Sequence, residues 1–149
     1  MFSIRAMRES DVPSCYEITL LNWNKTIADN FLIEVAHSWS GMESAPTYYI
    51  AETDDGVVIG YAGIMHSFIK TGVWDIVWVN VKKGYKGEGV GMKLMGLLIS
   101  EVKKANGVVI HLMTKSPSYF SQFGFHIIQT YDHWSLMSFT IGNFKESVL

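Results

Sequence analysis

Tyr85-Lys86-Gly87-Glu88-Gly89-Val90-Gly91 is a glycine-rich loop that lies between a strand-like run and an amphipathic helix. Glycines at alternate positions let backbone N–H groups approach a ligand without obstruction by side chains. A helix that begins near Gly89 adds the positive end of its dipole at the same place. The stretch therefore predicts a cradle for phosphate groups, filled by an anionic cofactor.

Two common phosphate-binding motifs do not fit the spacing of this loop. A P-loop ends in Gly-Lys followed by Ser or Thr, where this chain has Gly89-Val90 and Gly91-Met92. The dinucleotide-binding fingerprint needs a third glycine where Met92 or Leu94 stands. The pattern that remains is Arg/Gln-x-x-Gly-x-Gly/Ala, which Lys86-x-x-Gly89-x-Gly91 matches except for the lysine at its first position.

This pattern resembles the pyrophosphate-binding loop of the GNAT superfamily, the acetyl-CoA-dependent N-acetyltransferases. Val79-Asn80-Val81-Lys82-Lys83-Gly84-Tyr85 is similar to the strand end and turn before the family's loop, and residues 120–125 are similar to its late Phe-Tyr-x-x-x-Gly-Phe segment. The resemblance covers about residues 48–136. It implies one α/β (α+β) domain over residues 1–149 with the GNAT fold, a mixed and mostly antiparallel central sheet of about six to seven strands with about four helices.

Hydrophobic periodicity and turn signals predict the same order of elements. Asp54-Asp55-Gly56 is typical of a hairpin turn, and Asn106-Gly107 ends a helix. The expected strands are residues 2–7, 47–51, 57–65, 73–81, 108–113, 125–131 and 134–141. The expected helices are residues 12–23, 27–39, 90–105 and 117–122.

Composition and charge limit the class of protein and its partners. With 149 residues, 48% of them hydrophobic and 17% charged, the chain is expected to form one globular domain. A net charge of −2 and a pI of about 6.2 argue against a nucleic acid or an anionic membrane as the main partner. The chain has no apolar run of spanning length, and its one cysteine, Cys15, cannot form an internal disulfide, so we expect a cytoplasmic protein.

The resemblance implies direct transfer of an acetyl group from acetyl-CoA to a primary amine of a small molecule or peptide, in a ternary complex and without a metal. A homodimer is compatible with the sequence. Backbone groups at the end of the strand before the loop would pair with the pantetheine arm, and the loop amides would hold the pyrophosphate. The residues that the resemblance assigns to acetyl-CoA are Val79, Asn80, Val81, Lys86, Gly87, Glu88, Gly89, Val90, Gly91, Met92 and Phe120.

Asp75 is the candidate general base, because the acceptor amine must lose a proton before it attacks the thioester. Several members of the family, histone-acetyltransferase relatives among them, carry a glutamate at the corresponding place on this strand. Strand alternation puts Asp75 on the same face as Val77 and Val79, where burial would raise its pKa. A structural carboxylate, paired with a lysine or capping a turn after Gly72, is the alternative, and both interpretations stay open. If Asp75 is structural, the base is to be sought among His133, Glu34 and ordered water.

The candidate general acid is Tyr119. Family members commonly protonate the departing thiolate with a tyrosine in the late segment, but alignment on Gly124-Phe125 puts Phe120 at that position. Tyr119 is adjacent, while solvent or Ser121 are alternative proton donors. The displaced tyrosine also leaves a second function open, that of a non-catalytic acyl-CoA-binding or interaction protein with the same fold.

Other aromatic residues and the histidines favour structural interpretations. Trp23, Trp39 and Tyr48 lie where the family builds its acceptor site, but we expect them to pack in the core. Trp74 and Trp78 alternate on one face of their predicted strand and are also expected in the core. No histidine has a second ligand at the spacing typical of a metal site, so no metal is expected.

Overall fold

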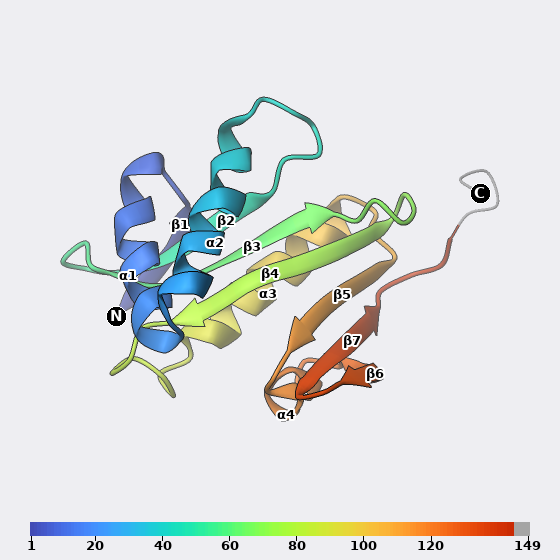
Figure 1. The fold of residues 1–149 in the computed structure, drawn as a ribbon. Coiled ribbons are helices and arrows are strands. Elements are labelled where there is room, and N and C mark those ends of the chain that lie inside the picture. The colour runs from blue at the N-terminus through green and yellow to red at the C-terminus, as the bar shows by residue number, and fades with distance from the viewer. Residues whose placement is uncertain (145–149) are drawn as a thin grey trace.

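A mixed β-sheet forms the centre of this protein, whose computed structural model describes residues 1–144 (Figure 1). Its strands are β1 (Phe2–Ala6), β2 (Thr47–Thr53), β3 (Val58–His66), β4 (Val73–Val81), β5 (Val109–Thr114), β6 (His126–Tyr131) and β7 (Trp134–Thr140). Within the described residues the seven strands have the order β1-β2-β3-β4-β5-β7-β6. Only β4 and β5 run parallel. This confirms the expected mixed and mostly antiparallel sheet.

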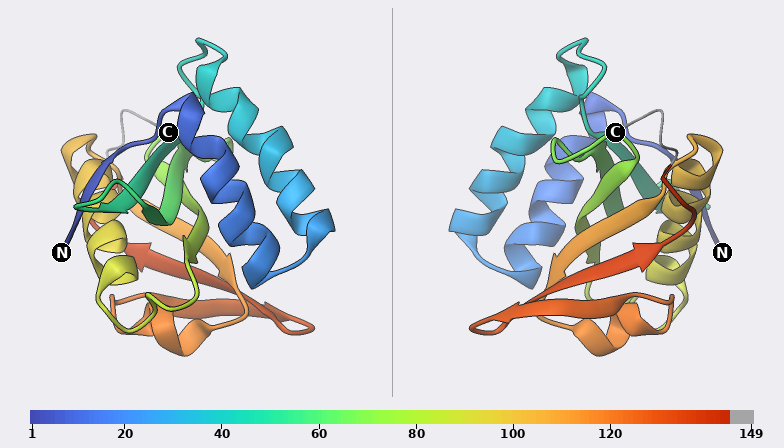
Figure 2. Two further views of the ribbon diagram at one scale, coloured as in Figure 1. Left: turned by 90° about the vertical axis from the view of Figure 1, so that its left-hand side faces the viewer. Right: turned by 90° about the vertical axis from the view of Figure 1, so that its right-hand side faces the viewer.

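Helices lie on both faces of the sheet. They are α1 (Val12–Asn22), α2 (Lys25–Val35), α3 (Val90–Lys104) and α4 (Pro117–Ser121), with 3-10 turns at Glu9–Asp11 and Ala36–Trp39. α1 and α2 cover one face, and α3 covers the other with α4 beside it (Figures 1 and 2). The order of elements is the predicted one. Residues 145–149 of the predicted domain lie outside the described residues.

The second helix differs in its bounds from the prediction of residues 27–39. Its N-cap is Asn24, whose side-chain Oδ1 accepts a hydrogen bond from the Ile27 amide at 2.9 Å, so the helix begins at Lys25. After Val35 the chain tightens into the 3-10 turn of Ala36–Trp39. The capping side chain therefore lengthens the helix at its start, and the tighter turn shortens it at its end.

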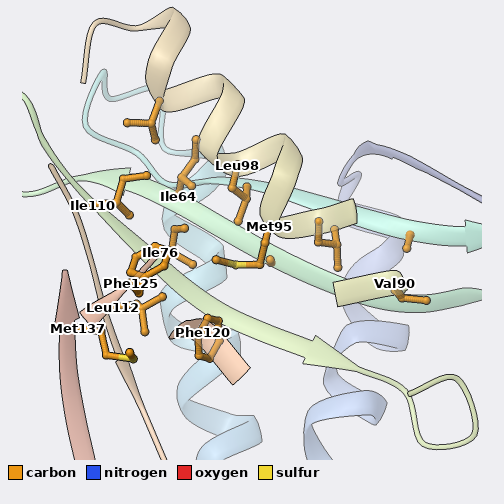
Figure 3. Packing of buried hydrophobic residues seen from close by; sticks show 14 of the residues in the cluster. Ile64, Ile76, Val90, Met95, Leu98, Ile110, Leu112, Phe120, Phe125 and Met137 are labelled. Atoms are coloured by element: carbon orange, nitrogen blue, oxygen red, sulfur yellow. The ribbon is translucent and has the colours of Figure 1, made fainter. Parts of the chain in front are cut away.

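Two hydrophobic clusters fill the two sides of the sheet. The larger packs α3 and α4 against the sheet and contains Leu94, Leu98, Ile110 and Phe120 (Figure 3). The smaller packs α1 and α2 against the opposite face. Leu94, Leu98 and Val102 recur at helical spacing along α3 and are fully buried, so they form the stripe that faces the sheet.

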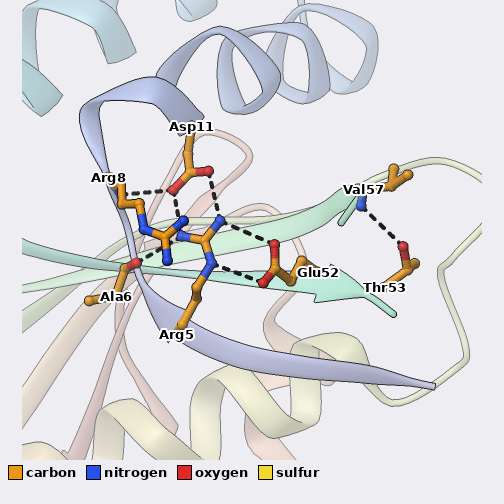
Figure 4. A network of polar contacts seen from close by, with 7 residues as sticks. All are labelled: Arg5, Ala6, Arg8, Asp11, Glu52, Thr53 and Val57. Atoms are coloured by element: carbon orange, nitrogen blue, oxygen red, sulfur yellow. Dashed lines mark hydrogen bonds and ion pairs between the residues drawn. The ribbon is translucent and has the colours of Figure 1, made fainter. Parts of the chain in front are cut away.

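One arginine ties the first strand to its neighbours (Figure 4). The Arg5 guanidinium donates to both carboxylate oxygens of Asp11, at 2.7 and 2.9 Å, and to both of Glu52, at 3.0 and 3.1 Å. The Arg5 hydrogen bonds hold the pKa of the Asp11 carboxyl below its usual value. β1, β2 and the start of α1 are thus joined by charge-assisted hydrogen bonds.

β4 contains a bulge at Trp78 that changes which side chains share a face. The backbone of Trp78 has φ of 56°, and the pairing with β3 shifts between Tyr61 and Gly63. Val77 and Trp78 consequently pack on the α1/α2 side, whereas Val79 packs on the α3 side. The expectation that Asp75, Val77 and Val79 share one face was therefore wrong for Val79.

The same bulge separates the two tryptophans of β4. Trp74 packs on the α3 side and Trp78 on the α1/α2 side, so the prediction that they alternate on one face was also wrong. A regular strand has a period of two, and one extra residue reverses the face of every side chain that follows it. No turn residue in the sequence marks the bulge.

β4 and β5 pair over only a short distance. Val73, Trp74 and Asp75 are matched with Val109, Ile110 and His111, and the strands then separate. The rest of β4 keeps its pairing with β3 on the other side. An edge of unpaired backbone groups is therefore left on β4 after Asp75, facing the space between the two strands (Figure 1).

Candidate functional site

The space between the separated strands is part of a cavity of about 1380 Å³. Its walls come from β4 and β5, the glycine-rich loop with the start of α3, α4, the α1–α2 segment and the start of β7. We name its two ends by their residues. The loop end is formed by Tyr85, Lys86, Gly87, Gly89 and Gly91, and the acceptor end by Glu34, Asp75, Val77, Trp78 and His111.

Backbone geometry at the loop end requires glycine at two positions. Gly87 has φ of 85° and Gly89 has φ of 84°, and Gly89 is the N-cap of α3. A Cβ at either position would meet nothing within 4 Å, so the backbone conformation and not crowding excludes other residues. The first N–H groups of α3 have no partner within the helix and lie at the positive end of its dipole. This geometry fits the pyrophosphate of a nucleotide cofactor.

Gly91 is a glycine for a different reason. It is buried within the first turn of α3, and a Cβ there would overlap the hydroxyl oxygen of Tyr119. The Tyr119 hydroxyl therefore lies against the start of α3, at the loop end of the cavity. Partial burial raises the pKa of the Tyr119 phenol, which makes it a weaker acid than an ordinary tyrosine.

Phe120 and Met92 complete this wall of the cavity. Phe120 lines the cavity but is 8% exposed and belongs to the larger hydrophobic cluster. Met92 and Lys86 line the cavity from exposed positions. Glu88 is exposed at the tip of the loop. The loop thus contributes backbone, one lysine and apolar surface to the site.

Asn80 holds the end of β4 against α1. It is buried, and its Oδ1 accepts hydrogen bonds from Asn22 Nδ2 at 3.2 Å and from the Trp23 indole at 3.1 Å. Asn22 Nδ2 also donates to the Val81 carbonyl at 2.9 Å. The Asn80 amide donates to the Tyr61 hydroxyl at 3.4 Å. The side chain of Asn80 therefore positions the strand, while its backbone borders the cavity.

Asp75 stands at the point where β4 and β5 separate. It is matched across the sheet with Met65 on β3 and with His111 on β5, so the three side chains form one row on one face. Burial raises the pKa of the Asp75 carboxyl, and the charge of His111 opposes that shift. The predicted direction of the Asp75 pKa is confirmed.

The two candidate catalytic residues are not brought together. The Tyr119 hydroxyl lies near Gly91 and the end of β4 at Val81. From Val81 back to Asp75 a strand covers about 20 Å. A position at the Trp78 bulge lies between the two groups along β4. Proton transfer to Asp75 would then pass through water.

Glu34 is a second carboxylate at the acceptor end. It comes from α2, and it accepts a hydrogen bond from the indole Nε1 of Trp78, the bulge residue. Glu34 therefore lies beside the bulge of β4, although Glu34 and Trp78 are 44 positions apart in the sequence. Only the packing of α2 over β4 shows this, since no motif surrounds Glu34.

A cation–aromatic cluster lies across the cavity from the loop. The rings of Trp23 and Trp134 stack with centroids 5.9 Å apart, and the Lys115 ammonium lies 5.7 and 5.1 Å from the two ring centroids. All three residues line the cavity. Trp23 is 39% exposed, so the expectation that it packs in the core was wrong. Its neighbours in this cluster come from β7 and the segment after β5, which sequence spacing did not connect.

Other features of the described residues bear on cofactors and membranes. Among residues 1–144, no group of three or more His, Cys, Asp and Glu side chains is arranged to hold a metal ion. No helix within the same residues is long and apolar enough to cross a bilayer. Cys15 is buried in the smaller cluster, and burial raises the pKa of its thiol.

Residues 12–125 match the model of a family described as the acetyltransferase (GNAT) family. No curated protein sequence gives a significant match to the chain. Among solved structures, a putative acetyltransferase of the GNAT family from Desulfovibrio desulfuricans is similar with a TM-score of 0.82 at 14% identity, over 95% of this chain and 99% of that one.

Two further structures are similar over nearly the whole chain. The ribosomal-protein-S18-alanine N-acetyltransferase from Escherichia coli has a TM-score of 0.76 at 17% identity, over 100% of this chain and 99% of that one. The PaiA N-acetyltransferase from Thermoplasma acidophilum, in complex with coenzyme A, has a TM-score of 0.74 at 16% identity, over 95% and 99%. At these identities the likeness shows a shared fold, which confirms the predicted GNAT fold.

Proposed function

Because the chain belongs to the GNAT acetyltransferase family, we propose that it transfers the acetyl group of acetyl-CoA to a primary amine of a small molecule or peptide. One observation carries the proposal. β4 leaves β5 after Asp75, and the backbone edge that this exposes runs through the cavity to the glycine loop that caps α3. The cavity thus joins a site for pyrophosphate to a carboxylate with a raised pKa.

The residues at the loop end fit coenzyme A. The amides of Gly87 to Gly91 and the dipole of α3 would hold the pyrophosphate, and Lys86 would add a positive charge beside it. The unpaired edge of β4 around Val79 and Val81 would bond the amides of the pantetheine arm. The Thermoplasma acidophilum neighbour, solved with coenzyme A, supports this choice of cofactor.

The acceptor end supplies the chemistry for an amine. An ammonium group beside Glu34 at the Trp78 bulge would be attracted by the carboxylates of Glu34 and Asp75, and loss of its proton through water to Asp75 would leave the amine free to attack a thioester at the bulge. The new N–C bond forms as the C–S bond breaks. The departing thiolate takes a proton from the Tyr119 phenol, which is protonated at neutral pH because a tyrosine pKa is ordinarily about 10, and the phenolate then regains a proton from water.

The test is release of the coenzyme A thiol from acetyl-CoA in the presence of primary amines and of peptides with a free N-terminus. Detection of the acetylated amine by mass spectrometry must accompany the thiol signal, because simple hydrolysis also releases thiol. Binding of acetyl-CoA without acetylation of any amine would overturn the enzymatic proposal. It would favour the acyl-CoA-binding protein instead. We also propose that the protein is cytoplasmic, as expected from the sequence.

A further inference from the structure

A second pocket of about 360 Å³ opens on the face of the sheet that carries Asp75. It lies between the segment that leads from α2 into β2 and the far end of the β3–β4 hairpin. Its mostly apolar lining includes Met42, Pro46, Tyr48, Met65, Phe68 and Val77, while His37, Ser40 and Ser44 add polar groups. Nothing in the transfer of acetyl from coenzyme A requires this pocket.

The second pocket adjoins the acceptor end of the main cavity. Glu34 and Val77 line both spaces. Met65 lines the second pocket and stands directly beside Asp75 in the register of β3 and β4. A molecule bound beside Glu34 and Val77 would therefore lie next to both spaces.

Charge and exposure differ between the place where the two spaces meet, at Glu34 and Val77, and the rest of the second pocket. Glu34 is the only carboxylate that lines the second pocket within the described residues, and it stands at the junction itself. Beyond it, Phe68 is 82% exposed and Met42 is 65% exposed on opposite walls. Large apolar side chains left open to solvent beside a cavity are typical of a binding surface.

We propose that the second pocket binds the apolar body of the acceptor, and that the acceptor is a primary amine carrying an alkyl or aryl group. The ammonium head would lie beside Glu34 at the Trp78 bulge, and the apolar group would lie between Met42 and Phe68. The volume corresponds to about 12 water-sized groups, enough for a medium-length alkyl chain. The choice of an amine rests on the proposed function, whereas the apolar subsite does not.

The experiment measures binding and not turnover. Isothermal titration of n-propylamine, n-butylamine, n-pentylamine and n-hexylamine is carried out on the complex with coenzyme A, which has no acetyl group to transfer. Each methylene that enters the pocket should tighten binding by about three- to fourfold. A diamine of the same length as n-hexylamine should lose this gain, because its second charge would enter apolar surroundings.

Matched variants locate the effect. Phe68→Ser and Met42→Ser should each reduce the gain per methylene to less than about twofold, since each removes one apolar wall. Ile69→Ser is the control, because Ile69 is 78% exposed next to Phe68 but does not line the pocket. It should leave the series unchanged. Acetyl-CoA should stabilise all three variants as it does the parent protein, which shows that they are folded.

Two results separate this inference from the proposed function. If affinity is the same for all four alkylamines, or if Ile69→Ser acts as strongly as Phe68→Ser, the apolar subsite is wrong even where amines are acetylated. If affinity rises with chain length and falls in Phe68→Ser while no amine is acetylated, the subsite stands and the enzymatic proposal fails.

Discussion

The two ends of the cavity are built in different ways. The loop end is made by one continuous segment, in which backbone amides, placed by positive φ angles, would bind the pyrophosphate. The acceptor end is made by side chains from α2, β4 and β5, which are far apart in the sequence. A continuous segment leaves a pattern that can be read in the sequence. A site assembled from separate elements depends on the register that brings them together.

Gly89→Val tests the loop end and should have the largest effect. Valine cannot adopt the φ of 84° at the N-cap of α3 without strain, so the cradle should be lost. For the parent protein, acetyl-CoA at about 100 times its dissociation constant should stabilise the fold by about 2.7 kcal/mol. The variant should show no such shift in a thermal unfolding assay.

Glu88→Ala is the matched control, because Glu88 is exposed in the same loop and its side chain does not line the cavity. It should keep the full stabilisation by acetyl-CoA. A Gly89→Val protein that is still stabilised to the same extent would show that the cofactor does not bind at this loop.

Asp75→Asn tests the acceptor end. If Asp75 removes the proton of the amine, kcat should fall by about 100-fold while the affinity for acetyl-CoA is kept. The decrease in rate at acidic pH should disappear from the pH–rate profile. Glu34→Gln is the comparison, since Glu34 is the other carboxylate at this end. A loss of rate in Glu34→Gln alone would move the role of base from β4 to α2.

The stability of Asp75→Asn should change in the opposite direction to its activity. Burial raises the folded-state pKa of Asp75, so the folded protein holds this proton more tightly than the unfolded chain. Stability is therefore lost as the pH rises through the unfolded and then the folded pKa. Asn carries no charge, so the variant should be more stable than the parent at neutral pH and should lose that advantage below pH of about 3.9. Denaturation at both pH values measures this.

The sequence predicted the elements and the loop well, and the side-chain faces less well. The order and approximate bounds of the strands followed from periodicity, and β4 was predicted at the observed bounds, Val73–Val81. The bulge at Trp78 was not predicted, because a positive φ at a tryptophan has no local sequence signal. That single residue reversed the faces of Val79 and Trp78 relative to the expectation.

Contacts between distant elements account for the rest of what was missed. The stacking of Trp23 with Trp134, and the hydrogen bond from Trp78 to Glu34, join segments that no spacing rule relates. Gly91 was predicted to be a phosphate-binding glycine, and the structure adds that a Cβ there would overlap the Tyr119 hydroxyl as it now lies. A glycine can be favoured both by its place in a loop and by a close side chain from another element, and the sequence shows only the first.

Gly91→Ala tests the contact between position 91 and the Tyr119 hydroxyl. Its Cβ would overlap the Tyr119 hydroxyl, so the variant should lose about 1–3 kcal/mol of stability through overpacking. Tyr119→Phe removes the hydroxyl and should restore most of the loss in the double variant. Gly89→Ala should not be restored by Tyr119→Phe, because its cost comes from the backbone and no side chain is near. Chemical denaturation measures the four variants. If Tyr119→Phe restores the stability of Gly89→Ala as much as that of Gly91→Ala, the contact between Gly91 and Tyr119 is wrong.

Tyr119→Phe alone has the smallest expected effect. It tests whether a residue at the loop end takes part in the reaction at the acceptor end. The thiol of coenzyme A resembles an ordinary thiol, with a pKa of about 8.5, so its thiolate leaves without absolute need of a donor. Loss of the phenol should lower kcat by no more than about tenfold. Phe120→Tyr should give no gain, because Phe120 is 8% exposed and a hydroxyl there would enter the apolar cluster at a cost of about 1–3 kcal/mol. If Phe120→Tyr raises kcat and Tyr119→Phe does not change it, position 120 faces the sulfur. The proton donor then belongs where the family carries it, and Tyr119 serves only to close the loop end against Gly91.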